Sequence, residues 1–147
     1  MQLIVTVGTE DLLRSGPIIK ITIGNPSYPT KTATVNGLID TGAAITLLNP
    51  RLAKTCQLIQ RGMKRIRVAG NRDQPYPEFA ASIHFPNEDL AAFRVHGVVA
   101  CQIFEQTISC LIGRDILRYW EVTYNGRAGQ FQIRDLRSSP PELGFPE

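Results

Sequence analysis

Apolar and polar residues alternate along several short segments of the chain, a pattern typical of β-strands with one buried face. In residues 17–24, PIIKITIG, the isoleucines Ile19, Ile21 and Ile23 alternate with polar neighbours. Further segments of extended character follow downstream. The segments predicted as strands are, in chain order, 17–24, 32–39, 65–70, 80–85, 93–100, 106–112 and the two arms of 122–133.

Two pairs of these segments are predicted to form hairpins. The polar stretch 71–78, NRDQPYPE, separates the third and fourth strand segments and indicates a hairpin with a long tip. The dipeptide Asn125-Gly126 lies between the two arms of 122–133 and is a strong signal for a tight turn. The strands that flank each turn are therefore expected to be antiparallel neighbours.

Two short helices are also predicted. The segment 49–56, NPRLAKTC, begins with an Asn that can cap a helix and a Pro that suits the first helical position. The segment 114–120, RDILRYW, follows Gly113. Both segments are short, so helices are expected to be a minor part of the fold.

Short strands and frequent turn residues together predict an all-β domain, either a barrel or a sandwich. The chain has 147 residues, of which ten are proline and twelve glycine, so extended segments are interrupted often. This length predicts a single domain, which we place at residues 1–137. The tail at 138–147, SSPPELGFPE, is rich in proline and is expected to be disordered.

The charge distribution does not favour nucleic acid as a partner. Net charge is only +3, and basic residues are scattered along the chain. The densest cluster, residues 61–72, is interleaved with Ile66 and Val68, which favours the solvated face of a strand. No nucleic-acid partner is therefore expected.

Neither a membrane nor a metal is an expected partner. The N-terminal residues have no basic segment of the kind found in secretory signals, and no apolar run reaches the roughly 18 residues of a membrane span. Cys56, Cys101 and Cys110 are odd in number and have no CxxC spacing. Reduced thiols, a cytoplasmic location and no metal or cofactor are the expectations.

The stretch 37–48, GLIDTGAAITLL, places a carboxylate inside an apolar run. If the preceding residues form a strand, Asp40 lies at its end and is partly removed from water, which is costly without hydrogen-bond partners. Gly42 allows the backbone to turn sharply and to offer N–H groups to the carboxylate. Thr41 adds a hydroxyl that can bond to neighbouring backbone. The stretch therefore predicts a loop that presents one carboxylate to an open cleft.

A pair of such carboxylates could hydrolyse peptides without a metal. One ionised carboxylate activates water, and its protonated partner donates to the carbonyl, because two like charges about 3 Å apart cannot both ionise. The chain has a single Asp-Thr-Gly. The second carboxylate would therefore come from a second copy across a two-fold axis.

Three landmarks resemble those of the retropepsin-like aspartic proteases, and the match is closer to bacterial-type members than to viral ones. They are LIDTGA at 38–43, LIGRDIL at 111–117, and between them a hairpin tipped near residues 69–71. The resemblance implies a retropepsin-like acid protease barrel, a single lobe with a flap hairpin and one or two short helices. It also implies an aspartic endopeptidase that works as a homodimer on a peptide or protein substrate.

The resemblance also implies roles for individual residues. Gly113 would let its strand pass close beneath the active-site loop, and Arg114 would brace that loop. The implied catalytic residues are Asp40, Thr41 and Gly42, and the implied substrate-binding residues are Leu38, Ala43, Ala44, Ala69, Gly70, Asn71 and Leu111.

The chain also departs from the viral pattern. Viral members often carry an acid at the position of Ala44 that pairs with the arginine matching Arg114, so here Asp115 or a chain-terminal group is the candidate partner. Viral chains dimerise through terminal strands, whereas the folded part of this chain is expected to end in a hairpin. A non-catalytic dimerisation or peptide-binding module with the same fold is the alternative to an active protease.

Overall fold

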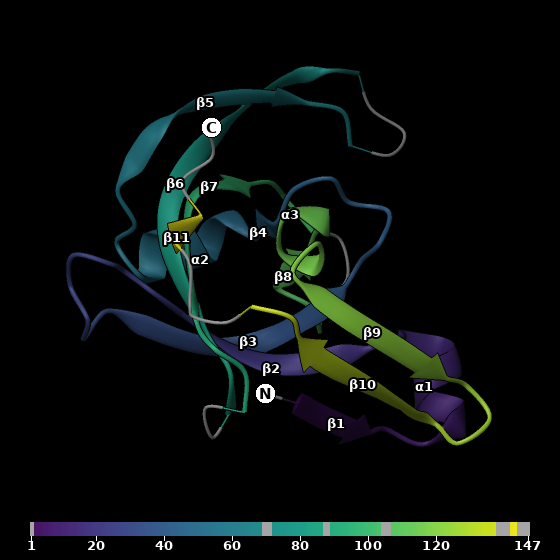
Figure 1. Ribbon diagram of the computed structural model, residues 1–147. Coiled ribbons are helices and arrows are strands. Elements are labelled where there is room, and N and C mark those ends of the chain that lie inside the picture. Colours follow the sequence, from purple (N-terminus) through teal and green to yellow (C-terminus); the bar gives the residue numbers. More distant parts are fainter. Residues whose placement is uncertain (1, 69–71, 87–88, 104–106, 138–141, 144–147) are drawn as a thin grey trace.

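The computed structural model describes residues 2–68, 72–86, 89–103, 107–137 and 142–143. Strands dominate the described chain (Figure 1). The helices are α1 (Thr9–Ser15), α2 (Pro50–Thr55) and α3 (Arg114–Leu117). The strands are β1 (Gln2–Thr6), β2 (Ile18–Gly24), β3 (Thr32–Ile39), β4 (Leu47–Leu48), β5 (Gln60–Ile66), β6 (Gln74–His84), β7 (Phe93–Ala100), β8 (Cys110–Ile112), β9 (Trp120–Asn125), β10 (Gln130–Asp135) and β11 (Glu142–Leu143).

Six strands close into a barrel. The larger sheet runs β11-β7-β4-β8-β3-β2-β6-β5, and an additional pairing of β6 with β7 joins its two sides. The closed ring is therefore β7-β4-β8-β3-β2-β6. β5 extends the ring beyond β6 and curves over it in Figure 1. The predicted all-β class is confirmed, and of the two architectures considered the chain forms the barrel.

The predicted alternation in β2 is confirmed by its burial. Ile19, Ile21 and Ile23 are buried in the barrel core, whereas Lys20 is exposed. β3 and β7 also have the predicted bounds, 32–39 and 93–100. Burial of each apolar face removes hydrocarbon from water, which is the main stabilising contribution here.

The hairpin formed by β5 and β6 differs from the prediction. Most of the predicted tip, residues 71–78, belongs to β6, which begins at Gln74. Pro75 and Pro77 pair with β5 where β6 has no second neighbour, because its pairing with β7 begins only at Glu78. Two prolines two residues apart lack their N–H groups on the same side of a strand. If that side is the open edge of β6, no hydrogen bond between strands is lost, and β6 can still pair with β5 on its other side. The prediction for 106–112 was also too long, since β8 spans only Cys110–Ile112.

Both predicted helices are confirmed. α2 begins at Pro50, and the side chain of Asn49 accepts a hydrogen bond from the Arg51 N–H at 3.2 Å. α3 follows Gly113 as expected, but it ends at Leu117 and is shorter than the predicted segment 114–120, because Trp120 already begins β9. Within the described residues no helix is long and apolar enough to cross a membrane.

A three-stranded sheet, β1-β10-β9, pairs a strand from the N-terminal end of the chain with two strands from its C-terminal part, and α1 follows β1 (Figure 1). Gly129 has a φ of 68°, and its carbonyl accepts hydrogen bonds from the N–H groups of Val7 and Gly8 at 2.8 and 2.9 Å. β1 and α1 were not predicted, so the expected one or two helices become three in the described chain. α1 buries only Leu12, which leaves too little apolar periodicity to recognise a helix.

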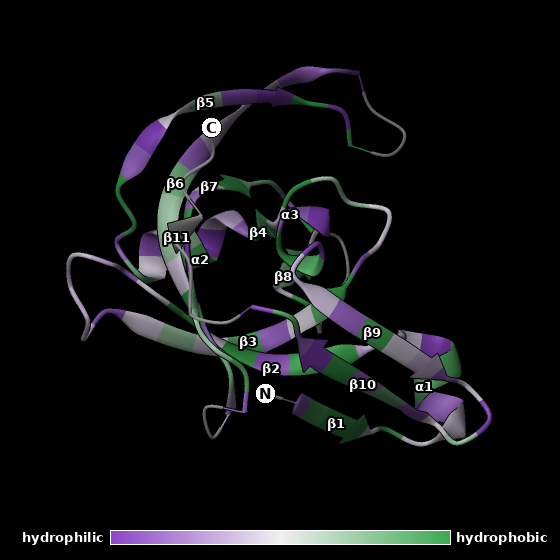
Figure 2. Cartoon of the chain, in the orientation of Figure 1, coloured by the Kyte–Doolittle hydropathy of each residue, from purple (hydrophilic) through white to green (hydrophobic). Residues whose placement is uncertain are grey.

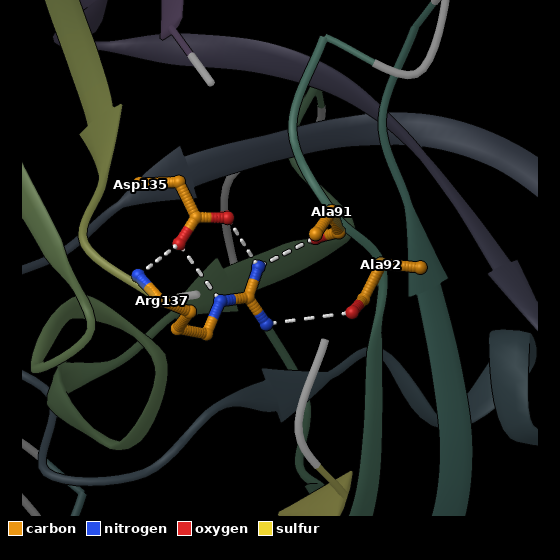
Figure 3. A network of polar contacts seen from close by, with 4 residues as sticks. All are labelled: Ala91, Ala92, Asp135 and Arg137. Atoms are coloured by element: carbon orange, nitrogen blue, oxygen red, sulfur yellow. Dashed lines mark hydrogen bonds and ion pairs between the residues drawn. The ribbon is translucent and has the colours of Figure 1, made fainter. Parts of the chain in front are cut away.

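A buried ion pair fastens the end of this sheet to the barrel (Figure 3). Arg137 donates to both carboxylate oxygens of Asp135, at 2.9 and 2.7 Å, and to the carbonyls of Ala91 and Ala92. Its guanidinium lies 3.6 Å from the centre of the Phe93 ring. Downstream, β11 pairs in parallel with β7. The rest of the predicted tail lies outside the described residues, and the domain limit at residue 137 stays a prediction.

The hydropathy of the chain follows this architecture (Figure 2). Apolar residues lie along the barrel strands and also along β1 and β10, whereas the hairpin strand β5 is largely hydrophilic. The pattern on β5 becomes important at the cleft described below.

Candidate active site

The loop that carries Asp40 leaves the barrel at the end of β3. β3 and β8 are parallel neighbours, with Leu38 opposite Leu111. The Asp40 N–H donates to the carbonyl of Ile112 at 3.0 Å, so the pairing extends one residue beyond the strand. The chain then returns as β4, antiparallel to β8. The two predicted motifs therefore lie side by side although about 70 residues separate them.

The carboxylate of Asp40 is held from within its own loop. Its Oδ1 accepts a hydrogen bond from the Gly42 N–H at 2.9 Å, and its carbonyl accepts one from the Ala43 N–H at 3.2 Å. A Cβ on residue 42 would lie 3.1 Å from this same Oδ1, so a larger residue would crowd the carboxylate. Asp40 is half-buried, whereas Thr41 and Gly42 are exposed. The loop thus presents a carboxylate that is fixed by hydrogen bonding but still accessible.

Arg114 braces this loop with no acidic partner among the residues that the structure describes. Its guanidinium donates to the carbonyl of Thr41 at 2.7 Å, and its own N–H donates to the carbonyl of Ala43 at 2.8 Å. These two bonds fix the backbone on either side of Gly42. An acid at the position of Ala44 is therefore not required to hold Arg114 against the loop.

Asp115 was a candidate partner of Arg114, but in the structure it bonds to Thr46 instead. Its carboxylate accepts hydrogen bonds from the N–H and the hydroxyl of Thr46 at 3.0 and 2.8 Å. Burial raises the pKa of Asp115, while the bonds from Thr46 and Ile116 act in the opposite direction. The Thr46 hydroxyl also accepts from the Gly113 N–H at 3.2 Å. Asp115 therefore fixes the far end of the active-site loop, and it does not pair with Arg114.

Gly113 passes directly beneath the active-site loop, as predicted. A Cβ at this position would lie 2.5 Å from the carbonyl carbon of Ile45 and 2.9 Å from the nitrogen of Thr46. Both contacts are with backbone, which cannot rotate away as a side chain can. Any larger residue must displace the loop that carries Asp40.

Replacing Gly113 by Ala is expected to destabilise the protein by about 1–3 kcal/mol or more, because the loop must move to accept the methyl group. Chemical denaturation would measure this change. The control is Gly126→Ala in the β9–β10 turn, where the new methyl would meet only the ring edge of Tyr124, at 3.2 Å. An unchanged denaturation midpoint for Gly113→Ala would contradict the proposed close approach.

A cleft of about 590 Å³ lies between the Asp40 loop and the hairpin formed by β5 and β6. The hairpin strand β5 crosses above the loop in Figure 1. The predicted residues Asp40, Gly42, Ala43, Ala44 and Leu111 all line this cleft. The other described residues that line it are Ile45, Leu47, Lys64, Arg65, Ile66, Arg67 and Val68.

Other predicted site residues lie outside this cleft or outside the described chain. Leu38 lines a smaller neighbouring pocket with Arg14 and Ser15, and Leu111 borders both spaces. Thr41 is next to the cleft on the exposed turn. The predicted flap residues Ala69, Gly70 and Asn71 lie outside the described residues.

No role in the site was predicted for the apolar side chains under the hairpin. Ile66 and Val68 pack, with Tyr76, against a buried cluster formed by Leu47, Val99 and Cys101. The alternation at positions 66 and 68 was visible in the sequence. Only the curvature of the hairpin shows that this alternating face turns towards Asp40.

The described residues contain no group of three or more His, Cys, Asp or Glu side chains that could hold a metal ion. Cys56, Cys101 and Cys110 are buried free thiols, and burial raises the pKa of each of them. The chemistry available in the cleft is therefore that of one accessible carboxylate, backbone groups and basic side chains.

Comparisons with known proteins agree with this geometry. The family of aspartyl proteases matches residues 19–116, which is more than half of the chain and contains the first motif and all but the last residue of the second. Among solved structures, the fold is similar to a retropepsin-like aspartic protease from Rickettsia conorii, with a TM-score of 0.53. The two chains are 12% identical, and the match covers 90% of this chain and 89% of the other. No curated protein sequence gives a significant match.

Proposed function

The chain belongs to the aspartyl protease family and has a retropepsin-like fold, and from this premise we propose that it is an aspartic endopeptidase active as a homodimer. The observation that carries the proposal is the Asp40 carboxylate, fixed by the Gly42 N–H and open to a cleft beneath a hairpin. Such a cleft can admit an extended peptide, and the carboxylate at its floor can act on water.

The proposed reaction uses two copies of Asp40, one from each chain. The pair shares one proton, since two adjacent carboxylates cannot both ionise. The ionised carboxylate takes a proton from water as the water oxygen attacks the peptide carbonyl carbon, and the protonated partner gives its proton to the carbonyl oxygen. The tetrahedral intermediate then collapses: the ionised carboxylate takes a proton from one of its hydroxyls as the C=O bond re-forms, the C–N bond breaks, and the leaving nitrogen takes a proton from the protonated carboxyl, so the pair again holds one proton. No metal is needed in this sequence of steps.

The neighbouring residues have supporting roles in this proposal. The exposed Thr41 hydroxyl has no hydrogen-bond partner within the described residues, so it is available to the loop of a second chain. Gly42 would contact the substrate through its carbonyl. Ala43, Ala44 and Leu111 would form the apolar floor, and Leu38 would extend that floor through the adjoining pocket.

Activity per chain is expected to rise with protein concentration and then to level off, because only the dimer has both carboxylates. The rate of cleavage of one fluorogenic peptide would be measured across a dilution series. Analytical ultracentrifugation at the same concentrations would give the fraction of dimer. A monomer that cleaves at full rate at every dilution would contradict the two-chain site.

A further inference from the structure

The hairpin strand above the active-site cleft is strongly basic. Lys64, Arg65 and Arg67 all line the cleft, whereas Asp40 is the one acidic residue among its described lining residues. The hydrophilic stretch of β5 is visible in Figure 2, where it curves over the barrel. The sequence indicated a solvated strand face for this region. The side chains are exposed as expected, but they also border the space in which a substrate would lie.

The basic positions are interleaved with the apolar positions that face the cleft. Side chains alternate along a strand, so Lys64 projects on the same side as Ile66 and Val68. These two apolar residues pack on the cluster beneath the hairpin, and Lys64 lies opposite Tyr76 of β6, which joins the same cluster. Lys64 is therefore directed towards the cleft, at one end of its apolar wall.

The cations differ in whether they already have a partner. Arg65 is 3.7 Å from the carboxylate of Asp73 and also donates to the carbonyl of Asp73. Lys64 and Arg67 make no ion pair within the part of the chain that the structure describes. Two cations at the border of the cleft are therefore available to a bound peptide. Arg67 lies one residue beyond the end of β5 and, by the same alternation, on the opposite side of the chain from Lys64, so Lys64 borders the cleft from its inner wall and Arg67 from its rim.

We propose that the cleft selects peptides with apolar side chains at the cleaved bond and acidic residues nearby, bound by Lys64 and Arg67. This inference rests on the proposed protease function and adds the substrate class. The apolar residues suit Ala43, Ala44, Leu111 and Val68, while Asp or Glu side chains about three positions apart suit the two cations. Basic residues near the cleft also attract acidic peptides over a distance and disfavour basic ones.

The first experiment compares matched fluorogenic peptides on the full chain. One peptide carries two Glu residues three positions apart, a second carries Gln at both positions, and a third carries Lys. An exposed ion pair changes affinity by about 1.4- to 5-fold, so with two such pairs the Glu peptide is expected to exceed the Gln peptide in kcat/KM by about 2- to 25-fold at low salt. The ratio should shrink at about 0.5 M salt, because the Debye length then falls to a few ångströms.

Charge-changing variants assign this preference to the two residues. In Lys64→Gln/Arg67→Gln the ratio of Glu to Gln peptide is expected to fall close to one. In Lys64→Glu/Arg67→Glu the Lys peptide should become preferred over the Glu peptide. Because each ratio is internal to one variant, a general loss of activity cancels. The matched control is Arg127→Gln, an exposed change in the β9–β10 turn that should preserve the parent ratio.

A binding measurement separates this inference from the proposed function. Fluorescence anisotropy would compare the same three peptides on the Asp40→Asn protein. Selective binding of the Glu peptide with no cleavage by the parent would reject the protease and support the substrate class. Cleavage of all three peptides with equal kcat/KM would support the protease and overturn the inference. Tight, salt-dependent binding of a random single-stranded oligonucleotide, without selectivity among the peptides, would also overturn it.

Discussion

Replacing Asp40 by Asn is expected to abolish peptide cleavage, with kcat falling by at least about a thousandfold. The amide oxygen can still accept the hydrogen bond from the Gly42 N–H, so the loop should keep its shape. An amide cannot take a proton from water, however, and it cannot share a proton with its partner. The variant would be compared with the parent by the rate of cleavage of one peptide and by thermal denaturation.

The control for this substitution is Asp11→Asn, the same chemical change on the exposed helix α1. It should leave cleavage unchanged because α1 contributes no carboxylate to the cleft. Equal cleavage by the Asp40→Asn variant and the parent would remove Asp40 from the mechanism. If the parent itself cleaves nothing but binds peptides, the non-catalytic module becomes the better account of the chain.

Mixing the variant with the parent tests whether both carboxylates come from separate chains. At constant total protein, random pairing leaves active dimers in proportion to the square of the parent fraction. An equal mixture should therefore retain about a quarter of the activity of the pure parent. A linear fall, with about half the activity retained, would indicate that each chain works alone.

Much of the barrel could be predicted because its strands have one buried face. β2, β3 and β7 follow their apolar alternation, so their predicted bounds are close to the observed ones. The hairpin was harder to predict because Pro75 and Pro77 are typical of a loop, yet they lie in β6 where that strand has a single neighbour. Local composition does not reveal which edge of a strand is left open.

The active-site loop was predicted more fully than its supports. The family resemblance implied that Gly113 passes beneath the Asp40 loop and that Arg114 braces it, and the structure has both contacts. The bonds between Asp115 and Thr46 could not be predicted, since each residue alone resembles an ordinary polar position. The basic residues of β5 were assigned to solvent because nothing local shows that a strand curves back over a cleft. In both cases the missing information was long-range geometry.

Breaking the ion pair between Arg137 and Asp135 is expected to cost about 3–5 kcal/mol of stability, the second large effect. Their side chains are only 5% and 2% exposed, so Arg137→Met would leave a buried carboxylate without its ion-pair partner, with the hydrogen bond from the backbone N–H of residue 137 remaining. It would also remove the bonds to Ala91 and Ala92 that fasten the chain to the start of β7 (Figure 3). Denaturant unfolding would measure the loss.

The matched control is Arg134→Met. Arg134 also donates two hydrogen bonds to a carboxylate, that of Glu121, but these side chains are 52% and 54% exposed. Water can solvate the remaining carboxylate there, so little stability should be lost. The double variant Asp135→Asn/Arg137→Met should recover part of the lost stability, since the uncompensated charge is gone. Equal effects of Arg137→Met and Arg134→Met would show that burial does not set the strength of these pairs.

The pH dependence of stability gives this pair a second signature. Burial alone would raise the pKa of Asp135, but the hydrogen bonds and charge of Arg137 outweigh it and lower this pKa below its ordinary value. A carboxyl whose pKa is lower in the folded state stabilises the fold above its unfolded pKa, near 3.9, and loses that contribution as pH falls through the folded pKa. The parent should therefore lose stability below about pH 4. In Arg137→Met the side-chain bonds and the charge that lower this pKa are gone while the backbone bonds remain, so the pKa should rise and the loss of stability below about pH 4 should become smaller. The same acid-side slope in both proteins would mean that other carboxylates control acid denaturation.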